Sequence, residues 1–153
     1  MTHEKWLQQT ISMAVNNVKE GGGPFAAVVV KDGLVIGEGT NLVHLHNDPS
    51  AHAELLAIRE ACKALSSTDL SDCVLYASGE PCPMCLGAAY WSNVGEIYYA
   101  CSKLEALNET GFGNPLSTFY SDQDKAPERR QIPFNQLKTD GSLAPFNEWK
   151  NNN

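Results

Sequence analysis

The segment that decides the fold reads FAAVVVKDGLVIGE and covers residues 25–38 of the 153-residue chain. Residues 25–30 form a short, apolar, β-branched run that is typical of a buried strand. Residues 31–33, Lys-Asp-Gly, are a hairpin-turn signal, and residues 34–38 return as a second strand. The sequence therefore predicts a β-hairpin as part of a sheet.

Helices alternate with strands on both sides of this hairpin. Before it, apolar residues recur at helical spacing over residues 3–18, and three glycines with Pro24 end this amphipathic helix. After it, a polar loop is expected over residues 39–47, and Asp48 looks like an N-cap with Pro49 at the first helical position. The alternation favours an α/β fold of one domain, residues 1–153, with a three-layer sandwich around a mixed sheet. The remaining predicted elements are a helix over 51–65, a strand over 73–77, a helix over 82–91, a strand over 96–100, a short helix over 126–130 and a terminal helix over 145–150.

Composition and charge exclude several classes of function. The formal charge is −7, whereas broad binding to a phosphate backbone needs clustered Lys and Arg, so a small neutral substrate fits better than a nucleic acid. The longest apolar stretch, residues 25–30, is too short to span a bilayer, and no signal peptide is recognisable at the start. Five cysteines without a secretory signal indicate a reducing, cytoplasmic setting, in which metal binding or burial is favoured over disulfides.

Three residues have the chemistry and spacing of metal ligands. His52 is expected in the first turn of its helix, and Cys82 and Cys85 lie three apart at the start of another, so they share a face. The partial positive charge of a helix N-terminus favours thiolate over thiol. Two thiolates and one imidazole make a three-ligand zinc site with a fourth position for water, whose pKa zinc lowers to about 7. Glu54 in the same turn as His52 can reach that water without binding zinc, and can act as proton shuttle.

Two other interpretations of these residues stay open. Cys82 and Cys85 also form the C-x-x-C pattern of thioredoxin-like redox sites. Alternatively, a closed structural zinc site would make the chain a zinc-stabilised binding module, which has no use for Glu54. That site needs a fourth protein ligand, for which the candidates are Cys62, Cys73, Cys101, His44 and His46. If they do not bind zinc, the two histidines are expected at the surface, and Cys62 and Cys73 in the interior.

The stretch His52-Ala53-Glu54, followed by Pro81-Cys82-Pro83-Met84-Cys85, matches the established H-x-E … P-C-x-x-C signature of zinc nucleobase deaminases. The residues around both parts, 47–54 and 80–91, resemble those of bacterial guanine deaminases of the cytidine/deoxycytidylate deaminase superfamily. Further short matches extend this resemblance over nearly the whole chain: Pro24-Phe25, Thr40-Asn41, Gly111-Phe112, Ile132-Pro133-Phe134, Pro145-Phe146 and Trp149.

The resemblance implies a cytidine-deaminase-like α/β/α sandwich, one Zn²⁺ per chain, and hydrolysis of guanine to xanthine and ammonia. It implies that Asn41 hydrogen-bonds the base, that Phe25 packs on its face, and that the backbone N–H of Ala53 helps to hold it. Trp91 is expected in the pocket wall because it follows the metal-binding helix. In similar proteins the C-terminal segment, here about residues 110–153, is exchanged within a homodimer and closes the partner's active site.

Two departures from the guanine enzymes concern the substrate. Those enzymes carry an Asp in the loop after Gly-Phe, which is thought to assist substrate binding and proton transfer, whereas this chain has Gly113-Asn114. Their chains also run a few residues further than Asn153 and end in an aromatic contact. Asn114 is therefore expected at the substrate, while cytosine, another heterocycle or a nucleoside stay open as alternatives. A tRNA adenosine deaminase shares both motifs, but a tRNA reader should show a basic face and this chain is acidic.

Overall fold

The computed structural model describes residues 1–113 and 115–153 of the chain. They form two compact units, Met1–Leu116 and Ser117–Asn153. The elements of the first unit are α1 (His3–Lys19), β1 (Ala26–Lys31), β2 (Leu34–Thr40), α2 (Val43–His46), α3 (Ala53–Leu65), β3 (Val74–Gly79), α4 (Pro83–Trp91), β4 (Glu96–Cys101) and α5 (Lys103–Thr110). Those of the second unit are α6 (Phe119–Asp122), the 3₁₀ helix η1 (Pro127–Arg129) and α7 (Ala144–Asn151).

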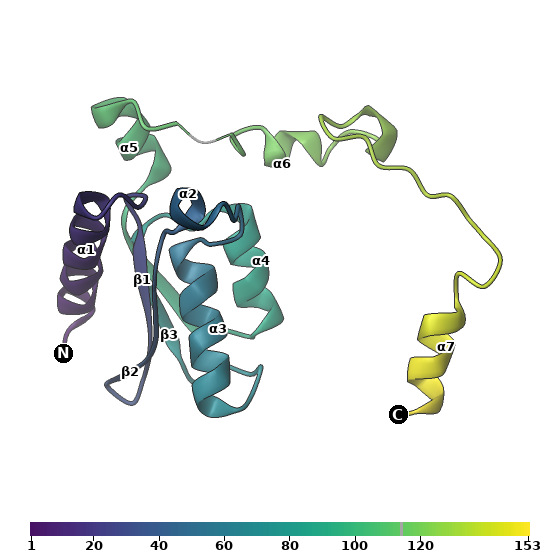
Figure 1. Cartoon of the computed structure of the whole chain (residues 1–153), viewed down its shortest axis with the longest axis horizontal. Helices are drawn as coiled ribbons and strands as arrows, with labels where there is room; N and C mark the ends of the chain where they lie inside the picture. The colour runs from purple at the N-terminus through teal and green to yellow at the C-terminus, as the bar shows by residue number, and fades with distance from the viewer. Residues whose placement is uncertain (114) are drawn as a thin grey trace. The chain divides into compact units, whose positions relative to one another are not determined.

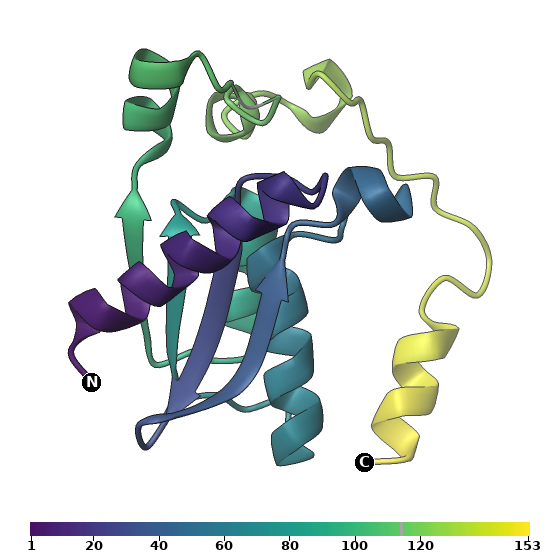
Figure 2. The same cartoon turned by 60° about the vertical axis from the view of Figure 1, so that its left-hand side comes forward.

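The first unit is a sheet covered by helices on both faces (Figures 1 and 2). The strand order is β2-β1-β3-β4; β1 is antiparallel to both of its neighbours, and β3 and β4 are parallel. On one face Ala27 and Val29 of β1 join the apolar core beneath α3. On the other face Val28 and Val30 of β1 pack with Trp6 of α1. The predicted three-layer sandwich around a mixed sheet is confirmed.

The β1–β2 hairpin forms where the sequence predicts it. Its two-residue loop places Asp32 at φ 50° and Gly33 at φ 76°. A tight two-residue hairpin of this kind needs positive φ at both positions, which Asp and Gly tolerate better than most residues. Strand β2 runs on to Thr40, two residues beyond its predicted end.

Helix α3 packs closely against β2 at two glycines. A Cβ added to Gly37 would overlap the carbonyl oxygen of Ala57, and one added to Gly39 would overlap that of Ala53. The side of the helix that faces β2 carries alanine at every fourth position, and all three of these residues are fully buried: Ala53, Ala57 and Ala61. Because β2 and β3 end at the same edge of the sheet, this contact places the start of α3 beside the loop that follows β3.

The region before α3 corrects one prediction. The helix begins at Ala53 with His52 as its N-cap residue, not at Asp48 and Pro49. Asp48 instead closes a local turn, because its Oδ1 accepts hydrogen bonds from Ser50 N–H at 2.8 Å and from Ser50 Oγ at 2.6 Å. The preceding segment, predicted as loop, contains the one-turn helix α2.

The later part of the chain holds elements that periodicity did not reveal. Helices α5 and α6 were not predicted, whereas the predicted terminal helix is confirmed as α7 and the predicted short helix over 126–130 is the 3₁₀ helix η1. The second unit is organised locally around Asp122, which accepts a hydrogen bond from Gln131 N–H at 2.8 Å and pairs with Lys125 Nζ at 3.0 Å. Among the described residues no helix combines the length and apolar character that crossing a bilayer requires.

Candidate active site

Two helix starts bring the predicted metal ligands together. His52 is the N-cap residue of α3, Cys82 is the N-cap residue of α4, and Cys85 lies in the first turn of α4. His52 and Cys82 were both expected inside their helices and instead lie just before them, because α3 begins at Ala53 and α4 at Pro83. Pro83 follows Cys82 as the first residue of α4, where its fixed φ and missing N–H suit a helix start. The two chain segments therefore present their donor atoms at adjoining N-termini.

The donor atoms are spaced for a tetrahedral metal. His52 Nδ1 lies 3.5 Å from Cys82 Sγ and 3.6 Å from Cys85 Sγ. Zinc bonds of about 2.3 Å to sulfur and about 2.0 Å to nitrogen at the tetrahedral angle would separate the same atoms by about 3.5 Å. The residues present thus fit zinc in both donor chemistry and separation.

A fourth protein ligand does not join this group in the described part of the chain. The cluster that could hold an ion consists of His52, Cys82 and Cys85. Closed structural zinc sites have four protein ligands, whereas catalytic sites keep a position open. All five cysteines are free thiols; Cys73 is buried, and Cys101 is exposed at the end of β4. The arrangement therefore favours an open site over a closed structural one.

Electrostatics prepare this site for a cation. The Cys85 thiol donates to Cys82, and together with the His52 ring it lowers the pKa of Cys82 to about 4. The same hydrogen bond to Cys82, followed by burial, raises the pKa of Cys85. The bond to Cys82 also raises the pKa of His52. One thiolate is thus stabilised before any metal arrives, and metal binding would displace the remaining protons.

Glu54 lies at this cluster and is almost completely buried, with 4% of its surface exposed. Its Oε2 is 3.6 Å from Cys85 Sγ. Burial raises the pKa of the Glu54 carboxyl, since water no longer stabilises its charged form. A carboxyl group in such a position can take a proton from one partner and return it to another.

Three predicted substrate contacts lie at the same end of the sheet. Asn41 directly follows β2, Phe25 directly precedes β1, and Ala53 opens α3. The Phe25 ring fills the space beside Gly79, where an added Cβ would come within 2.8 Å of Phe25 Cε1. The Ala53 N–H belongs to the first turn of its helix, whose N–H groups have no intrahelical acceptor. Asn41, Phe25 and Ala53 therefore lie at the same end of the sheet.

Comparison with known proteins identifies the family. The model of the MafB19-like deaminases matches residues 1–119. The chain belongs to this family. Over 152 residues it is 49% identical to the guanine deaminase of Bacillus subtilis (strain 168), an alignment that covers 99% of this chain and 96% of that protein.

Solved structures and a further relative agree with this assignment. The X-ray structure of guanine deaminase from Bacillus subtilis matches with a TM-score of 0.91 and 49% identity, covering 99% of this chain and 95% of that one. The guanine deaminase from Nitrosomonas europaea matches with a TM-score of 0.64 and 36% identity, covering 70% and 62%. The tRNA-specific adenosine deaminase of Aquifex aeolicus (strain VF5) is 37% identical over 147 residues, covering 90% of this chain and 97% of that protein.

Trp91, which was expected at the substrate, is not brought to the cluster of this MafB19-like deaminase. Trp91 ends α4, about 12 Å along the helix axis from its first residue, and is 89% exposed. The structure therefore does not place Trp91 in a pocket wall within one chain. Asn114 lies outside the described residues.

Phe112 is an aromatic neighbour of the deaminase site that local patterns did not assign. Its ring meets Phe25 edge-on, with centroids 5.5 Å apart. The chain reaches this position through α5, whose start is tied to the loop before Cys82: Glu80 accepts from the Lys103 N–H at 3.4 Å and pairs with Lys103 Nζ at 3.3 Å. The S-x-x-E pattern that opens α5 was the available signal for this helix.

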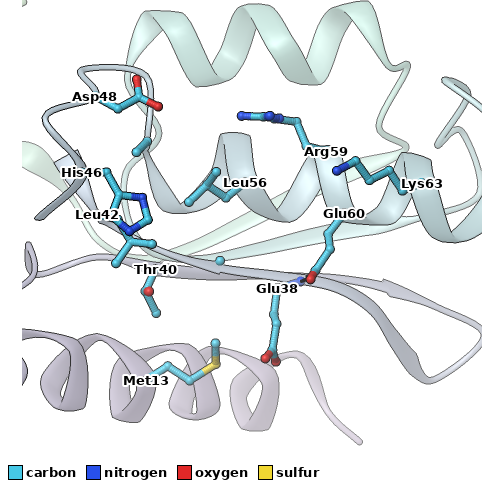
Figure 3. Close-up of a pocket in the computed structure, with 12 residues that line it drawn as sticks. Met13, Glu38, Thr40, Leu42, His46, Asp48, Leu56, Arg59, Glu60 and Lys63 are labelled. Atoms are coloured by element: carbon cyan, nitrogen blue, oxygen red, sulfur yellow. Dashed lines mark hydrogen bonds between the residues drawn. The ribbon is translucent and has the colours of Figure 1, made fainter.

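A separate groove of about 580 Å³ lies between β2 and α3 (Figure 3). Its lining includes Arg59, Lys63 and His46, but none of the three candidate metal ligands and not Glu54. Glu60, also in the groove, accepts a hydrogen bond from the Glu38 N–H at 2.8 Å and so satisfies a donor on the open edge of β2. His46 and its neighbour in α2, His44, are exposed, as expected. The deaminase chemistry is therefore to be sought at the helix starts and not in this groove.

Proposed function

We propose that this MafB19-like deaminase binds one zinc ion per chain through His52, Cys82 and Cys85, and hydrolyses guanine to xanthine and ammonia. The observation that carries the reaction type is the buried carboxylate of Glu54 beside three metal-type donor atoms. A structural zinc site has no use for such a carboxylate. The choice of guanine is supported by 49% identity to a guanine deaminase over 99% of the chain.

In this mechanism the protein supplies proton transfer and substrate placement. Zinc, when bound, lowers the pKa of a coordinated water toward neutrality. Glu54 would accept a proton from the attacking water and deliver it to the departing amino group, which leaves as ammonia. The water oxygen takes the place of the exocyclic nitrogen, so that guanine and water give xanthine and ammonia. Glu54 ends the cycle ionised, as it began.

Three groups would hold the base while this happens. The Asn41 amide donates to an acceptor on the ring, and the Phe25 ring packs on its face. The Ala53 N–H offers a further donor from the first turn of α3. Holding the ring against Glu54 converts an encounter in solution into a reaction within one complex.

The same proposal includes a cytoplasmic homodimer in which the segment from about residue 110 to 153 is exchanged between partners. Tyr90 and Trp91 of α4 are 82% and 89% exposed, and Phe146 and Trp149 of α7 are exposed as well. Exposed apolar surface of this kind is typical of contact sites. Five free thiols fit a reducing compartment, and the net charge of −7 does not favour a nucleic-acid partner.

A substrate panel tests the proposed function. Zinc-loaded protein is assayed for ammonia release from guanine, adenine, cytosine, their nucleosides and tRNA, with and without a chelator. We expect guanine to be turned over at least about a hundredfold faster than cytosine, and chelation to abolish the reaction. Turnover of cytosine with none of guanine would overturn the substrate assignment, and ammonia released only from tRNA would favour an adenosine deaminase of tRNA. If no compound releases ammonia, the enzyme interpretation fails.

A further inference from the structure

Asn17 places a polar amide on the face of α1 that packs against the sheet. The residue is only 5% exposed, and a buried amide costs free energy unless its donors are satisfied. Its Nδ2 donates to Gly23 O at 2.8 Å and to Asn41 O at 2.8 Å. Asn17 therefore occupies a position where helical periodicity calls for an apolar residue, and it bonds two loops from there.

The two loops are those that flank the candidate site. Gly23 lies just before Phe25 and β1, and Asn41 lies just after β2. The loops also bond each other, because Gly23 N–H donates to Asn41 O at 3.1 Å and Asn41 N–H donates to Phe25 O at 3.0 Å. Asn17 adds two bonds from α1, so the backbone of Asn41 is held from two directions.

Close packing limits the movement of both asparagine side chains. A Cβ added to Gly22 would overlap the Asn17 amide, and one added to Gly23 would come within 2.7 Å of Asn41 Oδ1. The two amides thus fill the space that ordinary side chains at positions 22 and 23 would need. Dense packing of this kind transmits a displacement of one group to its neighbours.

A hydrogen bond from Val43 determines which atom of the Asn41 amide is left for a ligand. Asn41 Oδ1 accepts a hydrogen bond from Val43 N–H at 3.2 Å. With the oxygen engaged, the amide has its Nδ2 hydrogens to offer, and these recognise a ring nitrogen or a carbonyl oxygen of a base. We propose that Asn17 is a positioning residue, which holds Asn41 so that its Nδ2 donates to the base. This inference rests on the proposed function, in which Asn41 binds the substrate.

Asn17→Ala removes both bonds from α1 and tests the inference in the full-length, zinc-loaded protein. We expect KM for guanine to rise about tenfold, because losing an oriented hydrogen bond weakens binding by about that factor. We expect kcat to change less than about threefold and zinc content to stay the same, because Glu54 and the ligands lie on other elements. In an Asn41→Ala background, adding Asn17→Ala should change KM less than about twofold, since the group that it positions is absent.

Thr10→Val is the matched control. Thr10 is fully buried on the same helix, but its hydroxyl bonds within the helix, to Leu7 O at 2.7 Å. The substitution removes a buried polar group from α1 without touching either loop, so it should leave KM unchanged even if it lowers the Tm. Equal increases in KM for Thr10→Val and Asn17→Ala would reduce Asn17 to a structural role and overturn the inference.

Hydrogen exchange separates this inference from the proposed function. In the absence of substrate, the backbone amide hydrogens of Gly23 and Asn41 should exchange about tenfold faster in Asn17→Ala than in the parent protein. Unchanged exchange contradicts the inference whatever the enzyme does with guanine. Conversely, faster exchange combined with a normal KM in Asn41→Ala would show that Asn17 holds the loop while Asn41 does not bind the base.

Discussion

At the scale of single residues, Glu54 carries the proposed chemistry, and its replacement gives the sharpest test. Glu54→Gln keeps the size and burial of the side chain but removes its ability to accept a proton. We expect kcat/KM for guanine to fall by a factor of about 10²–10⁴, the usual contribution of a general acid–base group. Zinc content by atomic emission should stay at one per chain, because Glu54 is not among the three donors of the cluster.

Glu60→Gln makes the same chemical change on the same helix, where the carboxylate bonds the Glu38 N–H and not the metal cluster. It should retain activity within about threefold, in keeping with a surface substitution. A Glu54→Gln protein that keeps more than a tenth of the activity would remove Glu54 from the proton-transfer role. Loss of zinc from that variant would show that Glu54 is itself a ligand.

The sequence predicts the site residues whose relation is local. His52 and Glu54 lie two apart, Cys82 and Cys85 three apart, and such spacings leave little freedom once a helix starts nearby. Asn17 is different, because its acceptor in Asn41 is 24 residues away. A polar residue in an amphipathic helix gives no sign of its partner until the fold brings the loop beneath it.

At the scale of elements, helix α5 links the candidate metal site to Phe112, and its start holds a carboxyl group, Glu105, whose pKa is lowered. Ser102 N–H donates to Glu105 Oε2 at 2.8 Å, and Ser102 Oγ accepts from Glu105 N–H at 3.1 Å. Hydrogen bonding of the Glu105 carboxyl to Ser102, through the backbone N–H first and the hydroxyl second, lowers its pKa below the ordinary value of 4.5. Because the pKa is lower in the folded state, the contribution to stability is complete above 4.5 and is lost as pH falls through the folded value.

An NMR titration of the Glu105 carboxyl should therefore give a pKa below 4.5, and Ser102→Ala should move it back toward 4.5. In the parent protein, protection of the α5 amide hydrogens from exchange should decline as pH falls through the pKa of Glu105. In Glu105→Gln it should not change over this pH range. Glu109→Gln removes a charge from the same helix outside the capping box and serves as the control. A pKa of Glu105 that is the same in Ser102→Ala and in the parent would show that the Ser102 hydroxyl has no electrostatic effect, since alanine keeps the backbone N–H that bonds the carboxylate.

Elements are predictable where a periodic pattern meets a clear stop signal. The hairpin satisfies both conditions, with β-branched strands around Asp32-Gly33. Asp48 does not act as an N-cap because its carboxylate accepts hydrogen bonds from Ser50, two residues later, in a local turn. A side chain that bonds its own turn in this way is not available to the first N–H groups of a helix. Helix α5 has eight residues and few apolar ones, so only its capping box distinguishes it from loop.

At the scale of the whole molecule, the two units differ in their interiors. The first unit has two apolar cores, one on each face of the sheet. In the described part of the second unit the buried residue is the polar Asp122, while Leu137, Phe146 and Trp149 are exposed. A short segment without an apolar core is not stable as an independent fold, so these side chains need another surface. Sequence periodicity has no way to identify that surface, because the information lies in a different part of the chain or in a second copy.

Exchange of the C-terminal segment predicts complementation between two defective chains. One chain carries Glu54→Gln with an intact tail, and the other carries an intact Glu54 with Phe146→Ala and Trp149→Ala in α7. If each tail closes the partner's active site, neither variant alone is fully active. In a mixed dimer, however, the intact Glu54 site is closed by the intact tail. Random pairing makes half of the dimers mixed, each with one complete site, so activity per chain should recover to about a quarter of the parent value.

The experiment is done by unfolding the two variants together, refolding them with zinc, and measuring ammonia release and the fraction of mixed dimer. If the tail closes the site of its own chain, the mixed dimer gains nothing, because the intact Glu54 still belongs to the chain with the altered tail. Activity of the mixture would then equal the mean of the separate variants. Full activity of the tail variant alone would remove the tail from the site altogether. Recovery above the mean requires the site to draw on two chains, since no single chain in the mixture carries both an intact Glu54 and an intact α7.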